Sequence, residues 1–249
     1  MKKLVLSIVS ALFAAGAAVA QLPDRIVCAG DYGGHLQGVA TDGESIYWSF
    51  TVAVVKTDLS GNILASRKAP SHQGDMCYKD GVVYVAVNLG KFNTETQGVS
   101  QVTSYDAKTL VPMKTVPLPE MPHGAGGMTW KGDRFYIIGG LPLKHEKNYV
   151  YEYTPDFTFV KRHVLETGYT VLGIQAAAFV RGQFLFGCYS NKEYPTHTLA
   201  CPTDLGSFKR LSMHTDVGMV DLDGKIFSAR TRRLPDGRWC GFLIPDEIK

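Results

Sequence analysis

The sequence predicts an all-β protein, folded as a single five-bladed β-propeller. Five segments share one strand–turn–strand pattern, a second strand pattern recurs between them, and no stretch has sustained helical periodicity. The 249 residues, of which 45% are hydrophobic and 20% charged, are sufficient for one full core. This composition excludes disordered, collagen-like and coiled-coil classes.

Residues 1–20 have the pattern of a signal peptide. Two lysines are followed by an apolar run over 4–15, and Ala-Val-Ala at 18–20 matches a cleavage site. The run is shorter than the ~20 apolar residues that span a bilayer. We therefore expect residues 21–249 to be the propeller, secreted or periplasmic, with no membrane span after cleavage.

The charge of the mature chain is nearly balanced. Residues 21–249 carry 24 Lys and Arg against 23 Asp and Glu. A nucleic-acid binder would show a stronger basic excess, so that class of partner is not expected. We expect a monomer whose ligand is a small molecule or a saccharide.

The first repeat predicts the inner hairpin of each blade. Its five copies span residues 35–50, 72–87, 123–138, 173–188 and 215–230. One column is small in four of the five copies, as crowded strands around a central axis require. The residues in this column are Gly38, Asp75, Gly127, Ala176 and Gly218.

The second repeat predicts the outer hairpins, with an Asp in each turn. Its copies span residues 54–67, 102–115, 149–162 and 197–210, and two hairpins per unit make one four-stranded blade. The fifth unit lacks a last strand, which residues 24–30 can supply, closing the ring and removing its free edges. A two-sheet sandwich is the structural alternative, but its strands would not recur in fours.

Five cysteines in a secreted chain leave at least one unpaired. Cys28 and Cys240 lie on strands expected to be neighbours, so a disulfide between them would close the ring. Cys188 and Cys201, on consecutive strands of the fourth blade, are a second possible pair. Cys77 is expected to be a buried free thiol.

Polar residues recur where the chain enters each inner strand, and these turns should open on one face. They include histidines in four of the five units, and the set is His35, Gln37, His72, Gln73, Asp75, His123, Gln175, His214 and Asp216.

Three roles remain open for the histidines. His35, His72 and His123 could bind a divalent transition metal or calcium, and neutral imidazole suits the former. His72 and His123 could instead act as general acid and base. Each could also simply satisfy backbone groups of its turn. No compact metal-binding motif decides among these roles.

Long loops on the same face offer cationic and hydrogen-bonding groups, as functional loops often do. We predict that Asn88, Lys144 and Arg230 bind substrate together with the three glutamines, and that Tyr189 is a candidate acid. Ordinary solvated loop tips are the alternative.

The blade pattern of HLQGVATDGESIYWSF (35–50) and HQGDMCYKDGVVYVAV (72–87) resembles that of the plant-type glutaminyl cyclase group. It is also similar to uncharacterised propellers exported by bacteria. The resemblance implies a secreted five-bladed propeller. The cyclase group carries its catalytic acid in a Gly-Glu-Gly stretch, where this chain has Gln73-Gly74-Asp75. Asp75 is therefore the candidate proton carrier for a cyclase reaction.

The leading expectation is an enzyme that acts on a polar or anionic sugar, with or without a bound metal. Abstraction of a proton from a uronic acid would use a His base, Tyr189 as acid and Arg230 as the carboxylate partner. Five-bladed propellers also include glycosidases with three axial carboxylates, but this chain offers two near the mouth, Asp75 and Asp216. Glutaminyl cyclase-like acyl transfer and a non-catalytic propeller that binds glycans or proteins are the alternatives.

Overall fold

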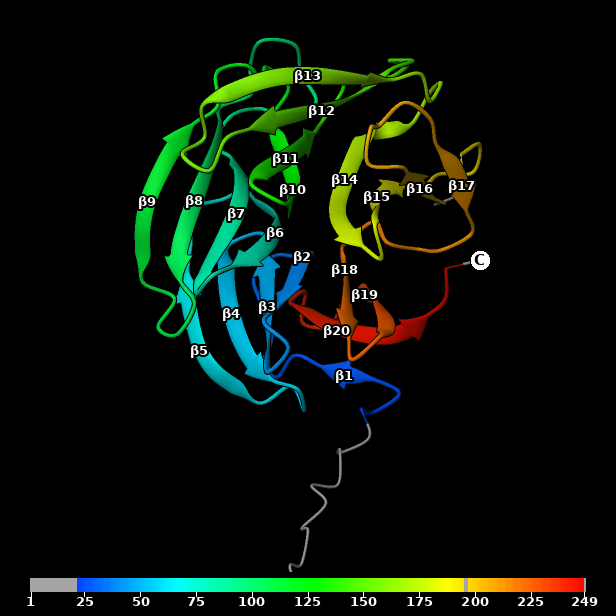
Figure 1. The fold of residues 1–249 in the computed structure, drawn as a ribbon. Helices are drawn as coiled ribbons and strands as arrows, with labels where there is room; N and C mark the ends of the chain where they lie inside the picture. The colour runs from blue at the N-terminus through cyan, green and yellow to red at the C-terminus, as the bar shows by residue number, and fades with distance from the viewer. Residues whose placement is uncertain (1–21, 195–196, 249) are drawn as a thin grey trace, which may run out of the picture.

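The computed structural model describes residues 22–194 and 197–248, and the predicted signal peptide lies outside them. The described residues form five four-stranded antiparallel sheets arranged in a ring, with no helix among them (Figure 1). The prediction of a five-bladed propeller is confirmed. Within the same residues, no helix is long and apolar enough to cross a membrane.

Each blade runs from an inner to an outer strand. Blade one is β2 (Leu36–Thr41), β3 (Ser45–Phe50), β4 (Ala53–Asp58) and β5 (Ile63–Lys68). Blade two is β6 (Gln73–Lys79), β7 (Val82–Asn88), β8 (Ser100–Asp106) and β9 (Pro112–Pro117). Blade three is β10 (Ala125–Lys131), β11 (Arg134–Gly139), β12 (Asn148–Tyr153) and β13 (Phe159–Leu165). Blade four is β14 (Val171–Val180), β15 (Gln183–Tyr189), β16 (His197–Cys201) and β17 (Lys209–Leu211). Blade five is β18 (Met219–Leu222), β19 (Lys225–Arg233), β20 (Trp239–Asp246) and β1 (Ile26–Val27).

Aspartates in the turns make the hairpins locally stable. Asp42 Oδ1 accepts hydrogen bonds from the backbone N–H groups of Glu44 and Ser45, at 2.9 and 2.6 Å. Asp58 Oδ1 accepts two more in the second turn of blade one, from Ser60 and Asn62. Such short side chains replace backbone partners that a tight turn leaves unpaired. The Asp in each repeat therefore marks where a strand ends.

Burial decreases from the axis outward. The middle strand β3 is buried throughout, with Trp48 inaccessible to solvent and its indole N–H donated to Thr57 at 2.9 Å. The outer strand β5 is exposed at most of its positions. The core is thus a ring of apolar layers between neighbouring blades.

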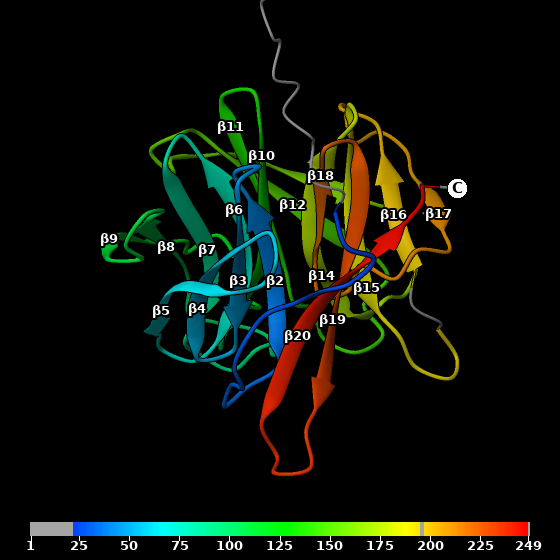
Figure 2. The same ribbon diagram turned by 90° about the horizontal axis from the view of Figure 1, so that it is seen from below.

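The two ends of the chain close the ring. Strand β1 pairs with β20, with Ile26 opposite Leu243 and Val27 opposite Phe242. Figures 1 and 2 show the N-terminal strand beside the last strand of the chain. The predicted closure is confirmed, and it removes the exposed edge that β20 would otherwise present.

The predicted disulfide between Cys28 and Cys240 is absent, and all five cysteines are buried free thiols. The N–H of Cys28 bonds to the carbonyl of Gly241, so Cys240 is one position away from the directly opposite residue. Neighbouring side chains on a strand point to opposite faces. The strands are adjacent as expected and the two thiols are near enough for Cys240 to act electrostatically on Cys28, but the register does not place them directly opposite each other.

The register of β15 and β16 also excludes the second suggested disulfide, between Cys188 and Cys201, because these residues are offset along the strands. Cys188 lies opposite His197, and Cys201 lies opposite Phe184, four residues farther along the same strand pair. Four residues of strand span about 13 Å, beyond the ~7 Å Cα separation that a disulfide tolerates.

Asp75 joins inner strands of different blades at the axis. Its side chain is 1% exposed. Oδ1 accepts from the N–H of Val39 in β2 at 3.1 Å, and Oδ2 accepts from the N–H of Ala177 in β14 at 2.9 Å. The N–H of Met76 is a third donor, from its own strand. One carboxyl group thereby bonds to the backbones of three blades.

The small residues of the inner column make room for this side chain. A Cβ at Gly38 would lie 2.2 Å from Asp75 Oδ1, and one at Gly127 would lie 3.0 Å from Asp75 Cβ. A Cβ at Gly218 would lie 3.3 Å from Oδ1. The column is small because the axis holds one carboxyl group from blade two.

We predict that Asp75→Asn destabilises the propeller. An amide NH₂ would face one of the backbone N–H groups that now donate to the carboxyl. Leaving a buried donor without a partner costs ~1–3 kcal/mol of unfolding free energy. Urea unfolding measures this loss, with Asp133→Asn at a 76% exposed side chain as the matched control. Equal midpoints for the two variants would contradict the axial role.

Candidate functional site

The two ends of the central channel differ in chemistry. We call the end where the inner strands begin the mouth. The other end is an open hollow of about 380 Å³, lined by residues of all five inner strands and largely apolar, with Met76, Trp130, Phe179 and Met219 in its wall. Asp75 lies between the two ends. The titratable side chains gather at the mouth, which makes it the candidate site.

Six polar side chains from four blades form what we call the mouth cluster: His35, Gln37, His72, Tyr189, Asp216 and Arg230. Gln37 is its centre. The Gln37 amide nitrogen lies 3.0 Å from Nε2 of His35 and 2.5 Å from Nε2 of His72, and the Tyr189 hydroxyl donates to its oxygen at 3.4 Å. These contacts connect blades one, two and four across the mouth.

The contacts determine the protonation of the two rings. Nδ1 of His35 lies 3.1 Å from the carbonyl oxygen of Leu36, which can only accept, so Nδ1 carries the proton. Nε2 of His35 is then an acceptor for one amide hydrogen of Gln37. The other amide hydrogen is donated to Nε2 of His72.

Both imidazoles are held neutral. Burial lowers the pKa of His35, and burial together with the nearby His35 lowers the pKa of His72 to about 4. A proton on either Nε2 would also oppose the N–H groups of Gln37. The arrangement therefore makes His72 a weak base at Nε2 and leaves its Nδ1–H as a donor toward a ligand.

Tyr189 and Asp216 continue the polar chain into blades four and five. Burial raises the pKa of Tyr189 to about 12, and the charge of Asp216 adds to this shift. Burial also raises the pKa of Asp216, whereas its own backbone N–H and then Arg230 oppose the shift. Tyr189 thus keeps its proton at neutral pH. Asp216, whose pKa is raised, binds a proton more readily than an exposed carboxylate does.

Arg230 is engaged by the protein itself, which differs from its predicted role as a substrate-carboxylate partner. Its Nη1 donates to the carbonyl oxygens of His214 at 2.5 Å and Ala229 at 2.8 Å, and Nη2 lies 3.9 Å from Asp246 Oδ2. Burial lowers its pKa, while Asp216 and Asp246 oppose this. The charge of Arg230 lowers the pKa of Asp216.

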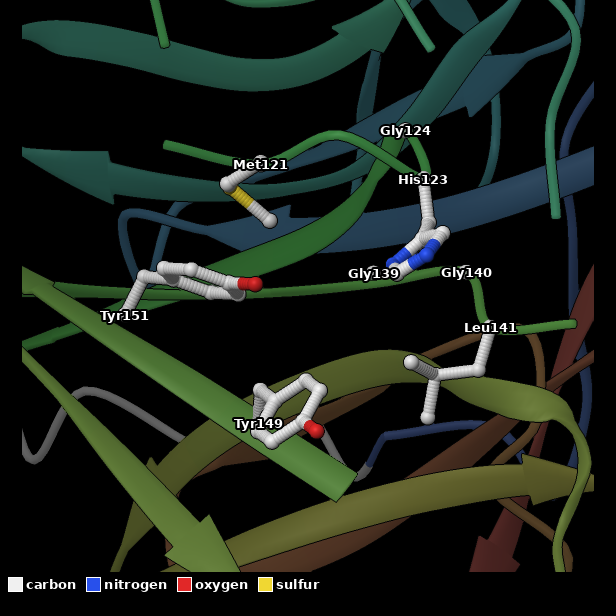
Figure 3. A pocket seen from close by; sticks show the side chains of 8 residues that line it. All are labelled: Met121, His123, Gly124, Gly139, Gly140, Leu141, Tyr149 and Tyr151. Atoms are coloured by element: carbon white, nitrogen blue, oxygen red, sulfur yellow. The ribbon is translucent and has the colours of Figure 1, made fainter. Parts of the chain in front are cut away.

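His123 is separated from the other two predicted metal ligands. Its ring lies 6.3 Å from that of His145, whose Nε2 is 3.0 Å from the Tyr149 hydroxyl. Figure 3 shows its imidazole above the Gly139–Gly140 backbone of a small pocket that Tyr149 also lines.

A phenylalanine lies where the three imidazoles would have to meet. The Phe92 ring stacks on His72 with centroids 6.1 Å apart, and it also packs against Gly124, next to His123. Among the described residues, no group of three or more His, Cys, Asp or Glu side chains could hold a metal ion. The predicted three-histidine metal site does not fit this arrangement.

Several other predicted site residues have structural partners. Gln73 and Gln175 each donate to the carbonyl oxygen three residues earlier, at 2.6 and 2.8 Å. Asn88 accepts from the N–H of Val99 at 2.8 Å within its loop and is 1% exposed. Lys144 is exposed on the rim. Gln73 also accepts from the Tyr105 hydroxyl at 3.4 Å, whereas Gln37 has contacts to three side chains, two of them imidazoles.

Asp75, predicted as catalytic, is buried beneath the mouth. Its oxygens accept three backbone N–H groups, and burial raises its pKa to about 8 against their effect. A carboxyl group so enclosed has no access to a substrate, which argues for a structural role.

Sequence reasoning did not single out two aromatic residues at the mouth. Phe92 belongs to the long loop after β7, whose length was the available signal. The ring of Trp239 lies 5.5 Å from that of His35. It comes from the start of the last strand, about 200 residues away, and no local pattern connects them.

We predict that Gln37→Glu raises the pKa of His72. A carboxylate would accept a hydrogen bond from a protonated Nε2 of His72, whereas the present amide directs an N–H group at that nitrogen. The charged imidazole is therefore stabilised in the variant, and its pKa rises. NMR titration of the histidine rings measures the midpoint, with His163, which pairs with Glu152 at 2.7 Å, as an internal reference. A His72 midpoint that stays near 4 would contradict the assigned hydrogen-bond directions.

No protein-family model matches the chain, and no curated protein matches it. Among solved structures, it is similar to a bifunctional GH43-CE protein of Bacteroides eggerthii (TM-score 0.60, 15% identity, 90% of this chain and 34% of that one). It is also similar to xylan β-1,4-xylosidase from Bacillus halodurans C-125 (0.59, 11%, 84% and 52%) and to RS223 β-xylosidase (0.54, 11%, 87% and 96%). The chain thus spans about a third of the first protein and half of the second. At these identities the likeness shows the fold, and it adds no support for the glutaminyl cyclase resemblance beyond five blades.

Proposed function

We propose that this chain is a carbohydrate-active enzyme that cleaves an acidic saccharide by elimination at the mouth cluster. The observation that carries the proposal is the gathering of perturbed titratable groups on one face. His35, His72, His123, Tyr189, Asp216 and Arg230 come from all five blades, and each has a shifted pKa. Such gatherings are typical of sites that move protons.

The arrangement suggests a role for each group. Asp216, whose pKa burial raises, would remove the proton beside the substrate carboxylate. The bond from the neighbouring carbon to the leaving oxygen breaks, a carbon–carbon double bond forms, and Tyr189 supplies a proton to the leaving oxygen. His72 would donate its Nδ1–H to the substrate. The role of base thereby moves from a histidine to Asp216, because the Nε2 lone pairs of His35 and His72 already accept N–H groups of Gln37 and the low pKa of His72 makes it a weak base.

Elimination is favoured over hydrolysis by the carboxylates present. Hydrolysis of a glycosidic bond commonly uses two carboxyl groups on either side of it. In the mouth cluster Asp216 is the single carboxylate, and Asp75 is enclosed below it. Two of the similar solved structures are named as xylosidases, which supports a sugar as the proposed substrate class.

The first test is turnover of acidic oligosaccharides, beside neutral xylo-oligosaccharides. Elimination yields an unsaturated product that absorbs in the ultraviolet. We expect Asp216→Asn to lower the rate about 10²–10⁴-fold, as loss of a general base does, with an unchanged melting temperature.

Asp221→Asn is the matched control, since Asp221 lies on β18 toward the opposite hollow. New reducing ends without ultraviolet absorbance would indicate hydrolysis. Saccharide binding without turnover would indicate a non-catalytic propeller. Either result would overturn the proposed elimination.

The pH dependence tests the partnership of Asp216 and Arg230. The base must be ionised, so the rate rises with pH through the pKa of Asp216. Arg230 lowers that pKa, and Arg230→Gln removes its charge, so the rising limb should move to higher pH. Arg232→Gln, at an exposed position two residues along β19, should leave the profile unchanged. A shift to lower pH in Arg230→Gln would exclude this role.

A further inference from the structure

A second polar and aromatic cavity lies on blade four, at the same end of the propeller as the mouth. Its volume is about 490 Å³, and it is lined by Thr167, Gly168, Tyr169, Tyr194, His197 and Arg210. These residues come from the segment before β14, the loop after β15, and strands β16 and β17.

The strand register places this cavity beside the mouth cluster. Tyr189 pairs with Val171 of β14, and the preceding Cys188 pairs with His197 of β16. His197 therefore lies one strand position from Tyr189, and its side chain shares a blade face with that of Cys188. Because Arg210 and Asp216 both act electrostatically on the buried Cys188, the cavity lies at the mouth end of blade four and extends outward over that blade.

Arg210 supplies a positive charge that no carboxylate of the described residues pairs with. Nη1 donates to Nε2 of His197 at 2.5 Å, and Nη2 donates to the carbonyl oxygen of Thr167. Within residues 22–194 and 197–248, no salt bridge involves Arg210. Arg230, in contrast, lies near two acids. Arg210 is thus the better partner for a carboxylate that arrives with a ligand.

The anchor of Arg210 is rigid. Thr167 is 4% exposed, and its hydroxyl accepts from Nδ2 of Asn148 at 2.7 Å. Asn148 is fully buried in β12 of the neighbouring blade. Two contacts to fixed groups hold the guanidinium in place, so little of its freedom remains to be lost on binding.

Two tyrosines form the remaining wall. The rings of Tyr169 and Tyr194 lie 4.2 Å apart at an angle of 74°. Each presents an apolar face and a hydroxyl, a combination that suits the apolar face and the hydroxyls of a sugar ring. Glu166 beside this wall is paired with Lys147, at 2.9 Å.

We infer that the Tyr169–Tyr194–Arg210 cavity is a second subsite, which binds a uronate unit of an acidic oligosaccharide whose neighbouring unit lies at the mouth cluster. The inference rests on the proposed function and makes it more specific. The substrate is then an acidic oligosaccharide rather than a free sugar acid.

The test is calorimetric binding of galacturonic acid and of its linear trisaccharide, with neutral xylotriose as the comparison ligand. Wild type, Arg210→Gln, Tyr169→Ala and Asp216→Asn are measured, and Lys209→Gln on the same strand is the matched control. We expect the trisaccharide to bind more tightly than the monosaccharide. Arg210→Gln should weaken the binding of both acidic ligands about tenfold or more, as loss of a charge-assisted contact does, and Lys209→Gln should leave both unchanged.

The outcomes separate the two proposals. Equal trisaccharide binding by wild type and Arg210→Gln, with turnover still lost in Asp216→Asn, would overturn the subsite and retain the mouth reaction. Trisaccharide binding that depends on Arg210 and Tyr169, without turnover in the wild type, would retain the subsite and overturn the elimination. Tighter binding of xylotriose than of the acidic trisaccharide, or no binding of either, would overturn the subsite.

Discussion

The carboxyl group of Asp75 at the propeller axis is the interaction on which the rest of the structure depends. Five inner strands converge there, and backbone N–H groups at a crowded axis need acceptors. Asp75 accepts from Val39, Met76 and Ala177, in three blades. The side chain fits because Gly38, Gly127 and Gly218 leave it space. The same group lies between the polar mouth and the largely apolar hollow at the other end.

Above this level, Gln37 organises the mouth through one amide. A side-chain amide offers two donors and an acceptor, and here they are directed at His35, His72 and Tyr189. The direction of these hydrogen bonds keeps both imidazoles neutral. Asp216, by contrast, has a pKa that burial raises and that its own backbone N–H and Arg230 oppose. The mouth cluster therefore has neutral side chains, Gln37 and the two imidazoles, at its centre. Its charged members, Asp216 and Arg230, lie in blade five.

The cations on this face divide into two kinds. Arg230 lies near two acids and two carbonyl oxygens, and it serves the protein's own electrostatics. Arg210 is held by a carbonyl oxygen and an imidazole without a neutralising carboxylate among the described residues, beside two tyrosines. A guanidinium of the second kind favours an anionic ligand. The face thus combines titratable groups of shifted pKa at the axis with a guanidinium and two tyrosines over blade four.

Much of the architecture was determined by the sequence itself. The recurring hairpins with their turn aspartates, the small inner column and the unpaired last unit are local patterns, and they predicted five blades closed by β1. The sequence also placed His35, Gln37, His72, Tyr189 and Arg230 at one end. It could not decide which of them meet. The tertiary structure decided that Phe92 lies between His72 and the His123 loop, that Asp75 points into the axis, and that Cys28 and Cys240 are out of register. Such contacts depend on side-chain direction and strand register between distant segments, and a shift of one residue reverses the face on which a side chain lies.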